Sequence, residues 1–253
     1  VISGATSLSK EPASGSGTQQ TGTLVLTGNN TYTGSTTINA GTLQVGNAGT
    51  TGTLGTGSVT VASGANLSFN RTDSVTVGNA ISGAGAVQQN GTGTTILTGT
   101  DTYSGTTTVN AGTLQVGNGG STGTLGTGAV TLYNGSNLNY QLATNTTISN
   151  AISGSGNVTA NITGALTDSG TINLTSGTVN LKGTTGVTLN NNITTSGSGG
   201  VVITAGDGTS SSSASLVAAS GETITQSSGS GSISLFTTGQ GNLTPSKIVQ
   251  NGT

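Results

Sequence analysis

The sequence contains no cysteine, histidine, tryptophan or methionine, and it carries very little charge. Without cysteine it has no disulfide and no thiolate metal site, and without histidine it has no Ser-His-Asp or Cys-His catalytic arrangement. Only 4% of its 253 residues are charged, with 4 Lys and Arg against 6 Asp and Glu. Because these cations form no patch that could neutralise a phosphate backbone, we expect no nucleic-acid partner. We also expect no cofactor.

Long apolar runs and aromatic residues are scarce as well. No stretch approaches the roughly 20 apolar residues that span a bilayer, so we expect no membrane insertion by this chain. The chain has 2 Phe and 4 Tyr, which are too few to fill the wide core of a β-sandwich or a propeller. The small apolar content also makes disorder an alternative, above all at residues 210–213.

Glycine, threonine, serine and asparagine are abundant, and the apolar residues come in pairs two apart. Leu24 and Leu26 form one such pair, and Leu43 and Val45 form another, with polar or small residues between the members. This period predicts short strands with one buried face, joined by turns that glycine permits. A strand with only two inward side chains needs neighbours above and below it. The pattern therefore predicts an all-β solenoid whose rungs lie about 4.8 Å apart.

A long internal duplication organises the chain. The motif around Tyr32 recurs around Tyr103, and in the same register residues from about 22 to 87 return as about 93 to 158. Beyond residue 160 this register is lost, although apolar pairs continue. We therefore divide the chain into an N-terminal segment (1–21), duplicated repeats with a 71-residue period (22–160), and an irregular continuation of the solenoid with a C-terminal segment (161–253).

The stretch from Gly22 to Gly46 resembles the autotransporter-associated β-strand repeat of bacterial passenger domains. The residues that carry the resemblance are Leu24, Leu26, Tyr32, Gly34, Gly41, Leu43 and Val45 in the first copy, and Tyr103, Gly105, Gly112, Leu114 and Val116 in the second. The second copy departs from the first at Thr95 and Asp101, which replace Leu24 and Asn30. The resemblance implies a right-handed parallel β-helix that is secreted to the surface of a Gram-negative bacterium. It further implies a scaffold and secretion aid without an active site.

These observations predict a non-enzymatic, extracellular structural protein, the scaffold of a surface adhesin or of a biofilm fibre. An alternative is a self-polymerising filament subunit, because a solenoid has two open ends with unpaired backbone groups. Inter-subunit strands could then form through Val1, Ile2 and Leu8 at one end and Ile233, Leu235 and Phe236 at the other. The expected partners are further copies of the chain, joined end to end or laterally, and host or matrix glycans.

Carboxylates are the only candidates for acid–base chemistry. Some parallel β-helices cleave polysaccharides with clustered carboxylates, and Asp73, Asp101, Asp168 and Asp207 could in principle meet on one face. Their spacing gives no support to this enzyme alternative, and the sequence favours solvated turn residues. Asp207 lies between two glycines, but a calcium site commonly needs several carboxylates, and a turn is the better interpretation.

Other polar and aromatic positions have structural interpretations. Arg71 and Asp73 would share one face of a strand, and an exposed pair of this kind contributes less than about 1 kcal/mol. Tyr32 and Tyr103 could contact sugars from the outside, although a ring that covers a neighbouring rung is favoured.

Asparagine occupies equivalent places in the two copies. Asn39 corresponds to Asn110, and Asn79 corresponds to Asn150. Stacked asparagines can form hydrogen-bonded ladders along a solenoid axis. We therefore expect such pairs to stabilise the turns.

Overall fold

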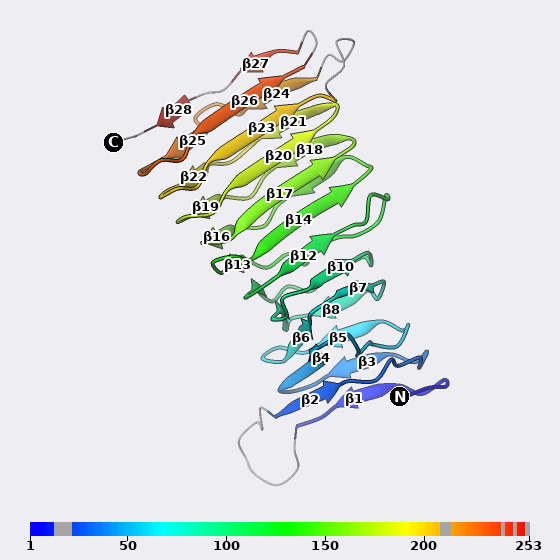
Figure 1. The fold of residues 1–253 in the computed structure, drawn as a ribbon. Helices are drawn as coiled ribbons and strands as arrows, with labels where there is room; N and C mark the ends of the chain where they lie inside the picture. The colour runs from blue at the N-terminus through cyan, green and yellow to red at the C-terminus, as the bar shows by residue number, and fades with distance from the viewer. Residues whose placement is uncertain (13–21, 208–213, 239–240, 245–246, 251–253) are drawn as a thin grey trace. The chain divides into compact units, whose positions relative to one another are not determined.

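A computed structural model describes residues 1–12, 22–207, 214–238, 241–244 and 247–250. Within these ranges the chain forms 28 β-strands and no α-helix, so that no described helix could cross a membrane (Figure 1). All the registered strand pairs are parallel. The predicted all-β, parallel β-solenoid is therefore confirmed. The serine run at 210–213 and residues 13–21 of the predicted N-terminal segment lie outside the described residues.

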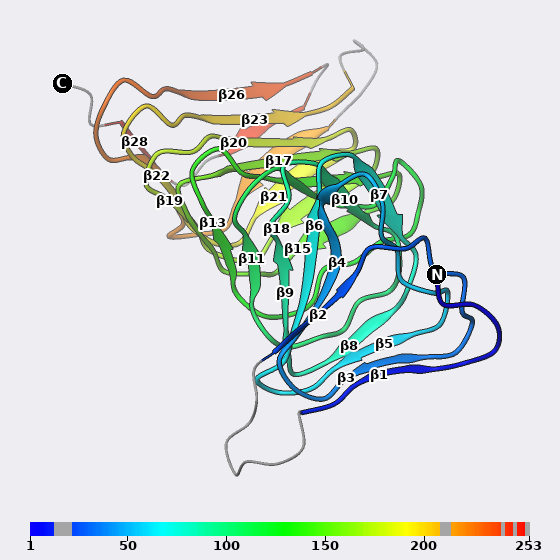
Figure 2. The same cartoon turned by 60° about the horizontal axis from the view of Figure 1, so that its bottom comes forward.

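The chain forms two compact units, and the first contains residues 1–118 and 122–129. Its strands are β1 (Leu8–Lys10), β2 (Thr23–Leu26), β3 (Thr36–Ile38), β4 (Thr42–Gly49), β5 (Val59–Val61), β6 (Asn66–Arg71), β7 (Ser74–Val77), β8 (Ile81–Gly83), β9 (Ala86–Gln89), β10 (Thr94–Leu97), β11 (Thr107–Val109) and β12 (Thr113–Val116). They pair in the orders β1-β3-β5-β8, β2-β4-β6-β9-β11 and β7-β10-β12. Figure 2 shows β1, β3, β5 and β8 side by side.

The turns of this unit differ in length, and they do not follow the period of the sequence repeat. Leu24 pairs with Leu43, Leu43 with Leu67, and Leu67 stands in register with Val87, so three turns return the chain to the same sheet at Val87. The 71-residue repeat instead places the counterpart of Leu24 at Thr95. Thr95 lies in β10, which belongs to another sheet.

This mismatch overturns the predicted ladder of equivalent asparagines. Asn39 follows β3 and donates a hydrogen bond to the Glu11 carboxylate at 2.7 Å. Asn110 follows β11, in a different sheet, and donates to Asn90 Oδ1, one turn away. Ladders thus join residues on successive turns, because one turn and not one sequence repeat brings two side chains together.

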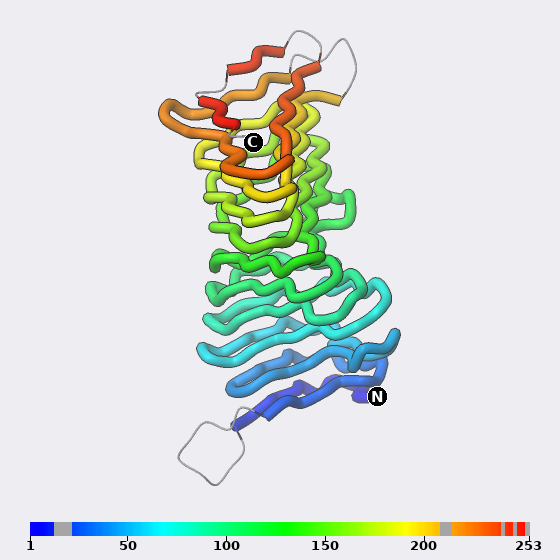
Figure 3. The backbone as a smooth tube through the Cα atoms, turned by 60° about the vertical axis from the view of Figure 1, so that its left-hand side comes forward, coloured from blue at the N-terminus to red at the C-terminus, as the bar shows by residue number. Residues whose placement is uncertain are grey.

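The second unit contains residues 119–121 and 130–253 and has more uniform turns, as the tube in Figure 3 shows. Its strands are β13 (Val130–Leu132), β14 (Asn137–Leu142), β15 (Thr146–Ile148), β16 (Ile152–Gly154), β17 (Asn157–Ile162), β18 (Ala165–Asp168), β19 (Ile172–Leu174), β20 (Val179–Gly183), β21 (Gly186–Leu189), β22 (Ile193–Thr195), β23 (Val201–Ala205), β24 (Ser215–Ala218), β25 (Thr223–Gln226), β26 (Ile233–Thr237), β27 (Leu243–Thr244) and β28 (Lys247–Gln250). They pair in the orders β13-β16-β19-β22-β25-β28, β14-β17-β20-β23-β26 and β15-β18-β21-β24-β27.

The core of each unit consists of columns of small aliphatic side chains. Ile152, Ile172 and Ile193 follow one another in register in the second unit, and each is at most 1% exposed. Alternate residues such as Ser153 and Asn173 point outward because successive side chains of a strand lie on opposite faces. Burial of each aliphatic side chain contributes about 1.5–3 kcal/mol, so stability accumulates turn by turn.

Gly154 should be intolerant of a side chain. Its φ of +118° strains any L-residue, and a Cβ there would overlap the carbonyl of Leu132 on the preceding turn. We expect Gly154→Ala to lower the free energy of unfolding of the second unit by at least about 1–2 kcal/mol. Urea denaturation followed by circular dichroism measures this change. Gly120→Ala is the matched control, since an added Cβ there meets open space; equal midpoints for the two variants would contradict the expectation.

Candidate functional site

The aromatic rings of the repeat are internal. Tyr32 and Tyr103 are both fully buried, and each hydroxyl lies 2.7 Å from the hydroxyl of a threonine on the same turn, Thr36 or Thr107. Burial raises the pKa of the Tyr103 phenol above its ordinary value. The rings are therefore closed to an external sugar, and they lie against a neighbouring turn, as the favoured interpretation has it, although they lie inside the coil.

Glycine on the next turn allows these rings to fit. A Cβ at Gly55 would overlap both the carbonyl and the ring of Tyr32, and a Cβ at Gly126 would do the same at Tyr103. The sequence signal was present, because Gly55 and Gly126 occupy equivalent positions in the two copies. Without the stacking register, however, nothing in the sequence joins either glycine to its tyrosine.

Asn30 links three successive turns of the first unit. Its side-chain oxygen accepts a hydrogen bond from the backbone N–H of Ile2 at 2.7 Å, and its Nδ2 donates to the carbonyl of Thr53 at 2.8 Å. The Thr53 hydroxyl completes the arrangement, accepting from Asn30 N at 2.8 Å and donating to Asn30 O at 3.1 Å. An amide suits this buried position because it both accepts and donates.

Asp101 occupies the same position in the second copy with an acid in place of the amide. It accepts from the Ile81 N–H at 2.9 Å, and Thr124 bonds to its backbone as Thr53 bonds to that of Asn30. Its second oxygen, Oδ2, has no hydrogen-bond partner. The side chain is only 4% exposed, and burial raises its pKa to about 7. The prediction of a solvated turn residue is therefore wrong here, because the repeat places this position inside the coil.

Asp168 is a second buried acid, in the second unit. It ends β18 with an inward side chain, in the column formed by Ile148 and Leu189, and it is fully buried. Neither carboxylate oxygen has a hydrogen-bond partner. Burial raises its pKa to about 7, and the nearby N–H of Gly170, which donates to Ile148 O, opposes this weakly. The solvated-turn prediction is wrong for this residue too.

Neither buried acid is placed for work on an external polysaccharide. Asp101 and Asp168 lie inside the coil, while Asp73 is paired with Arg71 and Asp207 lies at an exposed position with interactions of its own. Among the described residues, no group of three or more Asp, Glu, His or Cys could hold a metal ion.

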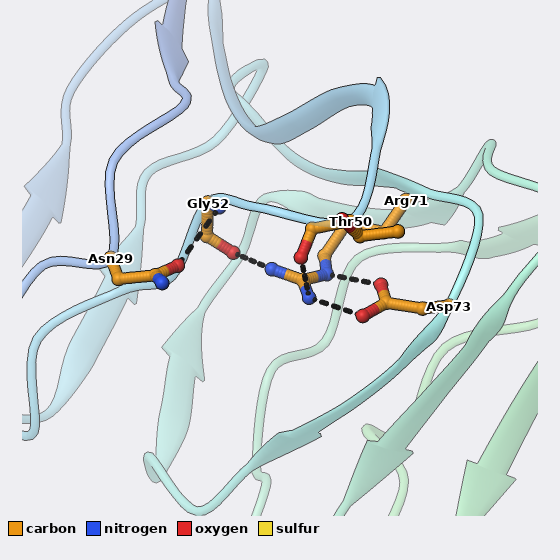
Figure 4. A network of polar contacts seen from close by, with 5 residues as sticks. All are labelled: Asn29, Thr50, Gly52, Arg71 and Asp73. Carbon is orange, nitrogen blue, oxygen red and sulfur yellow. Dashed lines mark hydrogen bonds and ion pairs between the residues drawn. The ribbon is translucent and has the colours of Figure 1, made fainter.

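Arg71 is a buried side chain at the centre of a polar network, shown in Figure 4. Its Nε and Nη2 bind the two Asp73 oxygens at 2.9 and 2.8 Å. Nη1 donates to Gly52 O at 2.5 Å and Nη2 donates to Thr50 O at 2.6 Å, while the Gly52 N–H reaches Asn29 Oδ1 at 3.3 Å. Arg71 is 7% exposed, and its hydrogen bonds to Asp73 lower the pKa of that carboxyl. The predicted exposure is therefore wrong for Arg71, whereas the Asp73 side chain is 37% exposed, and the small contribution of the pair to stability stays a prediction.

This network lies where the third sheet of the first unit begins. β7 is the first strand of that sheet and pairs with β10 on one edge. Beside its other edge the chain forms a loop. Arg71 donates hydrogen bonds to this loop at Thr50 O and Gly52 O. Asn79 donates to two further loop carbonyls, Gly55 O at 2.8 Å and Gly57 O at 2.6 Å. A cavity of about 440 Å³ lies between this loop and β7. Arg71 and Asn79 thus fix this loop beside the edge of β7 that has no paired strand.

Five of the six residues predicted to join subunits pair within their own chain. Leu8 lies in β1 beside Thr36, and the N–H of Ile2 binds Asn30, while Val1 is 88% exposed. At the other end of the chain, the residues in question belong to β26, which pairs with β23. They are Ile233 and Leu235, which continue inward columns, and Phe236, which points outward and is 53% exposed. Their role between subunits stays a prediction.

The fold and its buried Tyr–Thr–Gly contacts define a β-solenoid built on a passenger-type repeat. The passenger-associated transport repeat matches residues 14–45 and 87–116, which contain both tyrosines. These two segments of the chain therefore match the passenger repeat, and the resemblance seen in the sequence is confirmed.

A curated relative supports the same assignment. The adhesin BmaC autotransporter of Brucella suis biovar 1 (strain 1330) is 58% identical to this chain over 64 residues. The matched stretch covers 25% of this chain and 2% of that adhesin. No solved structure matches the chain.

Asp101→Asn should stabilise the first unit at neutral pH. The folded-state pKa of about 7 lies above the ordinary 3.8, so this acid contributes most favourably below about pH 4, and the contribution is lost as pH rises to about 7. The loss is on the order of a few kcal/mol. Asparagine removes it, and its Nδ2 can donate as that of Asn30 does. Urea denaturation in acidic and mildly alkaline buffer measures the difference.

The reciprocal variant is the control. Asn30→Asp should introduce a similar loss of stability as pH rises, because it places an acid in the equivalent site. A lower stability of Asp101→Asn in mildly alkaline buffer would contradict the assignment.

Arg71→Leu should destabilise the first unit, although leucine is the equivalent residue, Leu142, in the second copy. The substitution leaves the carbonyl of buried Gly52 without its side-chain donor, at a cost of about 1–3 kcal/mol, and it removes the donors of the more exposed Thr50 carbonyl and Asp73 carboxylate. Thermal denaturation measures the loss. Replacing Asp73 by Thr as well should restore only the part that comes from the unpaired acid. An unchanged midpoint in the single variant would mean that the pair is dispensable.

Proposed function

We propose that the chain is a non-enzymatic scaffold of a bacterial surface adhesin, extracellular on a Gram-negative cell. The observation that carries the proposal is the passenger repeat itself, whose tyrosines are buried as core residues in both copies. Because the side chains of this motif are buried in the core, the motif stabilises the coil. The residues on the outer face of the coil are then free to vary. The relative that is 58% identical over the matched stretch is named an adhesin, which supports the same role.

A coil of this kind suits a scaffold because each turn bonds to its neighbours along the whole strand. In the second unit, backbone and side-chain hydrogen bonds pass from turn to turn, as from Asn157 to Asn137 and from Thr178 to Asn157. Contacts therefore connect near neighbours, and length is gained by adding turns. We infer that the module holds other parts of an adhesin at a distance from the cell.

The outer face of the coil offers hydrogen-bonding groups almost without charge. One outward row of the second unit consists of Thr131, Ser153, Asn173, Thr194 and Thr225. Such a row bonds to hydroxyl-rich polymers or to a second coil with little electrostatic repulsion. We propose glycans of the host or matrix, and lateral contact between copies, as partners of this face.

A second candidate is a filament subunit that assembles end to end. Leu243 and Ile248 continue the inward columns of Leu216 and Ile224, yet they are 46% and 45% exposed. Inward apolar residues at the last strands favour a further turn stacked upon them, which a second copy could supply. This candidate requires filaments that grow with protein concentration.

Electron microscopy of the purified chain over a range of concentrations separates the two candidates. The scaffold predicts short single particles at every concentration, whereas the subunit predicts filaments that Leu243→Asp abolishes. An assay for new reducing ends, with candidate matrix polysaccharides, tests the absence of enzyme activity. A release of reducing ends that increases with the concentration of the chain, and that is lost in Asp73→Asn or Asp207→Asn, would contradict a non-enzymatic role.

A further inference from the structure

Asparagine followed by glycine occurs four times in the sequence. The pairs begin at Asn90, Asn118, Asn134 and Asn251, and the last of these lies outside the described residues. In such a pair the glycine nitrogen can attack the side-chain carbonyl carbon of the asparagine, because glycine has no Cβ to obstruct the approach. The reaction requires an exposed, mobile side chain and a glycine N–H that is not held elsewhere.

Asn134 and Gly135 meet these requirements. They form the exposed tip of a turn between β13 and β14, closed by the Ser136 N–H, which donates to Tyr133 O at 3.0 Å. Gly135 has a φ of +79° and no atom within 4 Å of an added Cβ. No hydrogen bond of the described structure uses the Gly135 N–H or the Asn134 side chain.

The pair at Asn90 and Gly91, by comparison, is held by hydrogen bonds that hinder the attack. Its side-chain nitrogen donates to Ser68 Oγ at 2.8 Å, and the Gly91 N–H donates to Phe69 O at 3.1 Å. Gly91 is buried so closely that a Cβ would overlap the carbonyl of Arg71. Attack at this position requires opening of the coil, which slows it in proportion to the population of the open state.

The pair at Asn118 is intermediate. Asn118 and Gly119 are both exposed, and an added Cβ at Gly119 meets open space. The Gly119 N–H, however, donates to Gln141 O at 2.8 Å, so the nucleophile is occupied.

We propose that Asn134 is a site of spontaneous covalent modification, at which the folded chain acquires a carboxylate with time. The Gly135 nitrogen forms a bond to Asn134 Cγ, the Cγ–Nδ2 bond breaks, and Nδ2 leaves as ammonia with the proton from the Gly135 nitrogen. Water then opens the cyclic imide at either carbonyl and leaves aspartate or isoaspartate at position 134. No oxidant, reductant or enzyme takes part.

The coil tolerates this change. Ser136 O accepts from the Asn157 N–H of the next turn at 2.9 Å, so the chain beyond the turn is fixed. The extra main-chain carbon of isoaspartate lies at the exposed tip, where Gly135 has free space. The first copy has Ser63 at the equivalent position, and its turn closes in the same way, from Ala65 N to Ala62 O at 3.0 Å.

The charge matters because the chain has so little of it. Six acids and four bases give a formal net charge of −2, and one modified asparagine makes it −3. The new carboxylate lies beside Tyr133, which is 53% exposed. Aged and fresh molecules therefore differ in surface charge while keeping the same fold.

The test is a time course of the folded, full-length chain in mildly alkaline buffer at body temperature. Pepsin digestion in acid followed by tandem mass spectrometry measures, at each asparagine, the mass gain from replacing NH₂ by OH. We expect modification at Asn134 to be at least about tenfold faster than at Asn90, with Asn118 between them. Anion exchange should show a more acidic species appearing at the same rate, and Asn134→Ser should remove most of it.

A parallel time course in concentrated urea separates the fold from the local sequence. There the three sites should react at similar rates, because the hydrogen bonds that protect Asn90 and Asn118 are gone. Equal modification rates at the three asparagines in the folded chain would overturn the proposal. So would the same ranking of the three sites in urea as in buffer. Loss of the circular dichroism spectrum on modification would overturn the claim that the coil tolerates it.

Discussion

The parallel backbone ladder between successive turns is the constraint on which this structure depends. The strands of successive turns pair in parallel about 4.8 Å apart, so that inward side chains stack in columns and each turn lies against the next. Small aliphatic side chains fill these columns, and glycine occurs at several positions where a Cβ would overlap the backbone of the neighbouring turn. Gly105 shows the limit, since an added Cβ would overlap the carbonyl of Gly85 one turn away.

Where the ladder is interrupted, single polar side chains take over its hydrogen bonds. Asn30 bridges the turns before and after it, and Arg71 and Asn79 hold a loop beneath the free edge of β7. The balance of hydrogen-bond donors and acceptors also explains why Asp101 destabilises the fold when it is ionised. A position built for one acceptor and one donor holds two acceptors as long as the acid is ionised.

The sequence predicted the strands and their buried faces well, because a period of two depends only on neighbouring residues. Leu24, Leu43 and Leu67 lie on inward faces as their spacing indicates. The prediction of solvated side chains failed for Asp101 and Asp168, because their burial depends on which turns lie above and below them. The turns of the first unit are unequal in length, and their lengths cannot be derived from a 71-residue repeat alone.

Arg71 shows the same limit from another side. Two residues on one strand with opposite charge are usually an exposed pair, and the local sequence contains nothing against that interpretation. The carbonyls that make Arg71 necessary belong to Thr50 and Gly52, on a loop well before it in the chain. Only the register of the coil brings these carbonyls to the guanidinium group. The second copy has Leu142 in place of Arg71, and this difference did not indicate that Arg71 is buried in the first copy.

The sequence repeat and the structural turn have different periods, and this affects valency. The first-copy strand at Thr23–Leu26 lies in one sheet, and its second-copy counterpart at Thr94–Leu97 lies in another. A ligand that recognised the outer surface of this motif would meet the two copies on different sides of the coil. Duplication has therefore lengthened the coil without aligning two identical epitopes, and a bivalent partner could not engage both along a single face.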